Sequence, residues 1–163
     1  MRARIAASLI VAASLMPLLP ASGQDRPDYL DDRSTASSVV ASFYNAINRQ
    51  EYSRAYSYFG IDAAGASYED FKAGYADTAS VSVKTGAEIS DGAAGSTYYT
   101  LPVAIDAQSR AGKHKVFAGC YTLRLVQPAV QDTPQFSPLH IEKAALKVAK
   151  GSLDMLVGKP CAP

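Results

Sequence analysis

The sequence predicts an α+β domain in which three N-terminal helices pack on a curved antiparallel sheet of about four strands. Between residues 34 and 75, apolar side chains recur every three or four positions, which is the period of an amphipathic helix. From residue 79 onward, apolar and polar side chains alternate over several stretches, which is the period of a strand with one buried face. Helices that precede a run of strands are typical of the α+β class.

The first expected helix ends near Arg49. Its N-cap is one of three polar residues, namely Asp31, Asp32 or Ser34. Its apolar face consists of residues at i, i+3, i+4 and i+7 spacing: Val40, Phe43, Tyr44 and Ile47. Asn45 and Asn48 lie off this face and are expected to meet water.

Two shorter helices follow. The second ends at Gly60 and has apolar residues at the same spacing: Tyr52, Ala55, Tyr56 and Phe59. The third begins with a variant of the capping box at Ser67, in which an acid stands three residues after the serine. Its apolar face consists of Tyr68, Phe71 and Tyr75.

Four strands are expected after residue 78, with approximate ranges 81–89, 98–106, 116–126 and 140–148. Pro102 lacks a backbone N–H, so it marks an edge, a bulge or a bend in the second of them. Gly119 gives the third strand a place to curl, or lets another group approach it closely. A loop with three prolines, 127–138, precedes the last strand.

Four segments of the chain resemble the NTF2-like superfamily. Val39–Asn48, Tyr52–Tyr56 and Phe71–Tyr75 follow the helix pattern with which an NTF2-like domain opens, and Gly119–Leu123 is similar to one of its long central strands. The resemblance covers residues 34–149, and the chain is similar in particular to exported bacterial members of this superfamily. It implies a cone-shaped fold in which the helices and the sheet enclose a pocket.

The N-terminal residues predict export. Met1–Arg4 is basic, residues 5–20 are apolar and uncharged, and Ala21–Gly23 supplies small residues for cleavage, so residues 1–23 form a secretory signal peptide. A membrane anchor is the alternative, but the apolar run is shorter than the roughly 20 residues of a spanning helix, and Pro17 and Pro20 would interrupt it. We therefore expect a periplasmic or secreted protein without a membrane span after cleavage.

The mature chain is expected to have three parts. Residues 24–33 form a flexible leader, 34–149 a single domain and 150–163 a C-terminal tail. The two cysteines, Cys120 and Cys161, favour a structural disulfide that tethers this tail, because an oxidising compartment promotes such a pairing. A free buried thiol at Cys120 and a bridge between two chains through Cys161 are the alternatives.

Composition and motifs argue against several function classes. With 16 Lys and Arg against 15 Asp and Glu and no basic run, the chain lacks the signature of a nucleic-acid partner. It contains no His-Glu-x-x-His motif, zinc-type cysteine spacing or phosphate-binding glycine loop, so we assign no metal, no cofactor and no catalytic residue. His114 is expected to be solvated and His140 to be structural. Asp62 and Asp70 are explained by their places near helix ends, and Asp106 should face water.

Five tyrosines lie on apolar faces that should meet between the helices and the sheet: Tyr44, Tyr56, Tyr75, Tyr99 and Tyr121. A buried tyrosine hydroxyl needs a hydrogen-bond partner, so a group of tyrosines suits a pocket with polar anchoring points. The alternative is that they are ordinary core aromatics. A small apolar or amphipathic molecule is the ligand that such a pocket would take.

Non-catalytic binding, of a small ligand or of a protein partner, is the function that the sequence favours. One alternative, implied by the NTF2-like resemblance, is a small enzyme of the ketosteroid isomerase or polyketide cyclase kind, which needs a carboxylate in the pocket as its base. Another is a homodimer or other protein complex formed through the outer face of the sheet, which should carry Tyr98, Thr100, Pro102, Val116, Ala118, Thr122 and Val126. We favour instead a cover formed by the tail residues Leu153, Met155, Leu156 and Val157.

Overall fold

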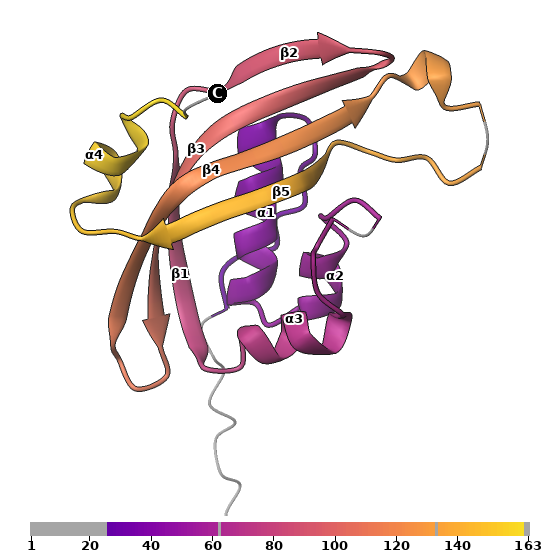
Figure 1. Cartoon of the computed structure of the whole chain (residues 1–163). Helices are drawn as coiled ribbons and strands as arrows, with labels where there is room; N and C mark the ends of the chain where they lie inside the picture. The colour runs from indigo at the N-terminus through magenta and orange to yellow at the C-terminus, as the bar shows by residue number, and fades with distance from the viewer. Residues whose placement is uncertain (1–25, 62, 133, 162–163) are drawn as a thin grey trace, which may run out of the picture.

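The computed structural model describes residues 26–61, 63–132 and 134–161 (Figure 1). Three helices come first: α1 (Ala36–Asn48), α2 (Tyr52–Tyr56) and α3 (Tyr68–Gly74). They are followed by β1 (Thr78–Thr85), β2 (Ile89–Ala93), β3 (Ser96–Ser109), β4 (His114–Val126), the 3-10 turn η1 (Pro128–Val130), β5 (His140–Val148) and α4 (Leu153–Val157). The α+β class is confirmed. The predicted signal peptide, residues 1–23, lies outside the described residues, and so does Asp62.

The strands form one antiparallel sheet in the order β1-β3-β4-β5, and β2 pairs with β3 beyond the end of β1. The expectation of about four strands is corrected to five, because the strand predicted over 81–89 ends at Thr85 and an additional strand, β2, forms over Ile89–Ala93. Pro102 lies opposite this break and has no N–H to donate, although its carbonyl still accepts from the Gly86 N–H at 2.8 Å. The proline therefore interrupts the ladder on the neighbouring strand.

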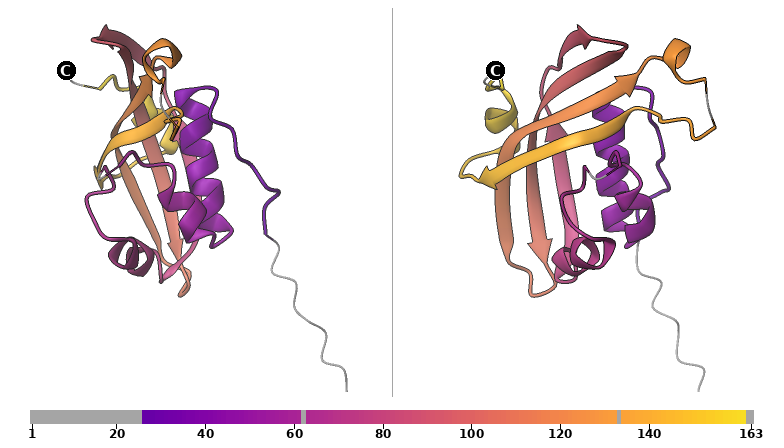
Figure 2. Two further views of the ribbon diagram at one scale, coloured as in Figure 1. Left: turned by 90° about the vertical axis from the view of Figure 1, so that its right-hand side faces the viewer. Right: turned by 45° about the vertical axis from the view of Figure 1, so that its right-hand side comes forward.

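α1 packs along the inner face of the sheet, and Figure 2 shows it on the side opposite the C-terminus. The four predicted apolar residues of this helix are buried: Val40, Phe43, Tyr44 and Ile47. Its N-cap is Thr35 rather than one of the three expected residues, and the Thr35 hydroxyl accepts from the Ser38 N–H at 3.0 Å. The Asn48 amide is half-buried and bonds to both backbone groups of Val81 in β1, so it ties the end of α1 to the sheet.

The described part of the leader, residues 26–33, is anchored to the helices, which differs from the flexible leader that we expected. The Asn45 carboxamide oxygen accepts from the Leu30 N–H at 3.1 Å. The Arg54 guanidinium donates to the Leu30 carbonyl at 2.7 Å and lies 4.5 Å from the centroid of the Tyr29 ring. Hydrogen bonds and a cation–π contact therefore hold this segment along α1.

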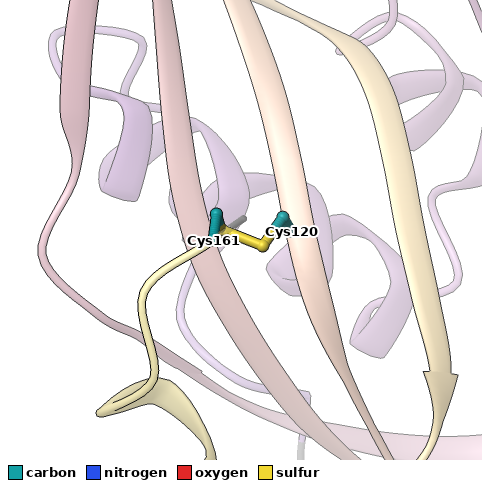
Figure 3. The surroundings of a disulfide bond; sticks show 2 residues. All are labelled: Cys120 and Cys161. Atoms are coloured by element: carbon teal, nitrogen blue, oxygen red, sulfur yellow. A yellow bond between two sulfur atoms is a disulfide. The ribbon is translucent and has the colours of Figure 1, made fainter. Parts of the chain in front are cut away.

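The C-terminal tail lies on the outer face of the sheet. Cys120 of β4 is joined to Cys161 by a disulfide, with the two Cα atoms 5.9 Å apart (Figure 3). Because Tyr121 faces the helices, its neighbour Cys120 faces the opposite side of the strand. α4 packs against β3 and β1, and Pro102 and Ala104 on this face of β3 are buried. The tail thus covers part of the apolar outer face.

Close packing of β4 against β5 depends on Gly119. A Cβ at this position would overlap the Ala145 carbonyl of β5, so no other residue fits without a shift of the backbone. This contact is the close approach for which the sequence placed a glycine in the strand. Ala144 and Leu146 of β5 lie on the inner face of the sheet, where they line a cavity.

We expect the Cys161→Ser variant to be less stable than the wild type by about 2–4 kcal/mol. The disulfide closes a loop with a sequence separation of 41 residues, and cross-linking such a loop lowers the entropy of the unfolded chain. Urea unfolding of both proteins, followed by far-UV circular dichroism, measures the difference. Wild-type protein treated with a dithiol reductant is the control and should match the variant. A disulfide-linked dimer, or no response to the reductant, would contradict the internal bridge.

Candidate functional site

A cavity of about 490 Å³ opens between α1, α3 and the inner face of the sheet. Its floor consists of buried residues: Tyr44, Val81, Ile105 and Tyr121. Its mouth consists of exposed residues: Asp70, Gly74 and Ala144. Phe71, Tyr75, Thr78, Ala107, Phe117 and Leu146 line the walls between them. A volume of this size, with mostly apolar walls and few polar groups, is typical of a site for a small molecule.

The polar feature of the floor is a pair of tyrosine hydroxyls. Tyr44 of α1 and Tyr121 of β4 form a hydrogen bond in which the two oxygens are 2.5 Å apart. It is the one hydrogen bond of either hydroxyl within the described part of the chain. Because a single hydrogen bond uses one of the two hydroxyl hydrogens, the other hydrogen is available to an acceptor in the cavity.

Burial raises the pKa of all three cavity tyrosines. Loss of hydration raises the pKa of Tyr44 well above its usual value, and the nearby Tyr121 and Tyr75 add to this rise. Burial raises the pKa of Tyr75 from 10.0 to about 12. Burial also raises the pKa of Tyr121, and the hydrogen bond with Tyr44 opposes part of that rise. At neutral pH the cavity therefore presents neutral hydroxyls.

α3 holds one wall of the cavity in place. The Ser67 hydroxyl caps this helix by accepting from the Asp70 N–H at 3.1 Å. Phe71 and Tyr75 lie one turn apart with ring centroids separated by 5.1 Å, and the Phe71 centroid is 6.3 Å from that of Phe43 in α1. These ring contacts bind α3 to α1, and so they keep the aromatic wall facing the sheet.

The structure brings three of the five predicted tyrosines together at the cavity: Tyr44, Tyr75 and Tyr121. Tyr56 instead packs on Phe71 and donates its hydroxyl to the Ala66 carbonyl at 2.9 Å, so it holds the loop before α3. Tyr99 is half-buried against the core and does not line this cavity. For these two residues, the alternative of ordinary packing describes what the structure shows.

Sequence reasoning did not place Asp70 at this cavity. Its carboxylate is exposed at the mouth and accepts from the Ser67 hydroxyl at 2.8 Å. The capping-box pattern accounts for an acid at this position, so no further signal in the sequence marked it. The spacing that puts Phe71 and Tyr75 on one face of a helix was the signal that could have located this wall.

Both histidines and Asp106 lie outside the cavity. His114 is exposed, and its Nδ1 is 3.0 Å from the Asp106 carboxylate. His140 is buried; its Nδ1–H donates to the Pro138 carbonyl at 2.8 Å, and its Nε2 lies 3.3 Å from the Glu142 carboxylate. Both imidazole rings thus have polar partners within the protein, which explains their positions without a functional role.

Neither a metal site nor a membrane span is found among the described residues. They contain no group of three or more His, Cys, Asp or Glu side chains arranged to hold a metal ion. None of their helices is long and apolar enough to span a membrane. Comparisons with protein-family models, with curated proteins and with solved structures find no match to this chain.

We expect the Tyr75→Phe variant to lose less stability than the wild type between pH 10 and pH 12. A tyrosine whose pKa is raised on folding contributes stability that is complete below the unfolded pKa of 10.0 and is lost as the pH rises toward about 12. The difference should reach up to about 2 kcal/mol at the alkaline end. Urea unfolding at several pH values measures it.

The matched control for this experiment is Tyr29→Phe, since Tyr29 is exposed and its replacement leaves the buried hydroxyls in place. That variant should follow the wild-type profile. Equal alkaline slopes for Tyr75→Phe and the wild type would show that burial does not hold this phenol neutral.

Proposed function

We propose that the chain is an exported NTF2-like domain that binds a small apolar or amphipathic ligand in this cavity, without converting it chemically. The observation that carries the proposal is a cavity with mostly apolar walls, on whose floor the hydroxyls of Tyr44 and Tyr121 are hydrogen-bonded to each other. Burial of an apolar body against such walls supplies affinity, and a few polar groups supply orientation.

The hydroxyl pair indicates what the deep end of the ligand carries. One hydrogen of the Tyr44–Tyr121 pair is free to be donated, so a carbonyl, ether or hydroxyl oxygen would complete its hydrogen bonding. A neutral acceptor suits this position because the site is buried and both phenols are neutral. A purely apolar ligand would leave that hydrogen unused.

The alternative of an isomerase or cyclase finds less support. Proton transfer needs a carboxylate that an apolar environment holds close to the reacting carbon. Asp70 is the one carboxylate on the cavity wall among the described residues, and it is exposed and bonded to the Ser67 hydroxyl. An acid in water at the mouth suits ligand capture better than catalysis at the floor.

Two features support the assignment to an exported NTF2-like domain. Helices precede a curved antiparallel sheet and pack on its inner face, as the resemblance over residues 34–149 implies. The Cys120–Cys161 disulfide is of a kind that persists in oxidising compartments, which agrees with the predicted signal peptide. The tail over β3 and β1 argues against a homodimer through the same face, since a partner would have to displace it.

We expect the Ala144→Phe variant to lose ligand binding while the Ala145→Phe variant retains it. Ala144 is exposed at the cavity mouth, whereas its neighbour points to the outer face beside Cys120. A phenyl ring at position 144 should weaken the binding of Nile red, a neutral dye with a carbonyl group, by at least about tenfold, which corresponds to 1.4 kcal/mol. Fluorescence titration of the mature protein measures the dissociation constants. Equal loss in both variants, or no binding by the wild type, would contradict the proposed site.

A further inference from the structure

We propose that the ligand of this cavity is an amphipathic organic cation, which places its ammonium group at the mouth and a hydrogen-bond acceptor at the floor. The inference rests on the proposed function, because it names the chemical class of ligand for the same cavity. Three features of the wall point to this class: the sign of its charge, its aromatic rings and the separation of its polar groups.

The charge on the wall is negative. Among the described residues that line the cavity, Asp70 is the one charged side chain, and neither lysine, arginine nor histidine occurs there. The Ser67 hydroxyl occupies one acceptor site of its carboxylate. A carboxylate has about four such sites, so Asp70 retains the capacity to pair with a cation. An anionic ligand would meet only this like charge.

Aromatic rings surround the same space. Five of the lining residues are aromatic: Tyr44, Phe71, Tyr75, Phe117 and Tyr121. Phe71 lies in the same helix as Asp70 and Tyr75 is its C-cap residue; the two ring planes are tilted by 58° with centroids 5.1 Å apart. The faces of aromatic rings attract ammonium groups, and sites rich in aromatic rings recognise quaternary ammonium ligands in other proteins.

The competing positive charges near the cavity belong to Lys113 and Lys115, which line an adjoining hollow. The Lys115 ammonium is 5.2 Å from the centroid of the Phe117 ring, in the same hollow, which Asp77 also lines. A ring of this cavity is therefore already in contact with a cation from outside. A ligand's ammonium group should accordingly sit beside α3, near Asp70 and Tyr75, rather than beside β4.

The polar groups are separated by an apolar middle. The tyrosine pair lies on the buried floor, Asp70 lies at the exposed mouth, and Ala107, Phe117 and Leu146 line the walls between them. A ligand that satisfies both ends carries an acceptor and an apolar group on the floor side and an ammonium group on the mouth side.

A matched pair of esters tests this assignment. Benzoylcholine carries a carbonyl, a phenyl ring and a quaternary ammonium group, and 3,3-dimethylbutyl benzoate has the same shape with carbon in place of the charged nitrogen. We expect isothermal titration of the mature protein to give about tenfold tighter binding for the cation, which is the effect of a partly desolvated cation–π and carboxylate contact. Added salt should reduce this preference.

Two variants of α3 locate the origin of the preference. Asp70→Asn keeps the shape and a carboxamide oxygen for the Ser67 hydroxyl, so the helix cap remains while the charge is lost. It should reduce the preference for the cation to about threefold or less, the part that the rings alone supply. Glu69→Gln removes an equal charge from the neighbouring residue, which does not line the cavity, and should leave the preference unchanged.

The outcomes separate this inference from the proposed function. Equal binding of the two esters, tighter binding of the neutral ester, or binding of Nile red without either ester would overturn the assignment of a cation and leave the cavity as a binding site. Equal effects of both variants would show that Asp70 does not recognise the cation, and this result would also overturn the assignment. Failure of both esters and of Nile red would overturn the proposed function itself.

Discussion

The hydrogen bond between the hydroxyls of Tyr44 and Tyr121 joins the helical layer to the sheet inside an apolar core. Each hydroxyl is buried, and an unpaired buried hydroxyl would cost about 1–3 kcal/mol, so each residue depends on the other. The partners come from α1 and β4, so the bond links the helix to the sheet at this point. The aromatic contacts of Phe71 and Tyr75 hold α3 beside this bond, and the space enclosed between them is the cavity.

The two faces of β4 contact different parts of the molecule. Tyr121 faces the cavity, while the adjacent Cys120 holds the tail on the outer face, because successive side chains of a strand point in opposite directions. The disulfide therefore stabilises the strand that carries the cavity floor without entering the cavity. A wall held in place before the ligand arrives loses little conformational entropy on binding, which favours affinity.

Sequence patterns predicted the features that depend on local periodicity, namely the buried face of α1, the helices before the strands and the pairing of two cysteines. They did not predict the break between β1 and β2, because its cause, Pro102, lies on the neighbouring strand. Nor did they separate Tyr56 and Tyr99 from the cavity tyrosines. Periodicity says which face a side chain occupies, but the position along the layer depends on how α3 docks, which only tertiary packing determines.

The placement of the polar groups bears on whether the cavity binds or reacts. A carboxylate that abstracts a proton has to meet the substrate beside the groups that stabilise the developing charge, and those groups would be the hydroxyls of Tyr44 and Tyr121. Asp70 is instead at the mouth, solvated and bonded to Ser67. The two polar ends orient a ligand that is long enough to reach both. At neither end, however, do an acid and an oxyanion donor lie beside the same part of the ligand. Separated in this way, the two polar groups favour recognition over chemistry.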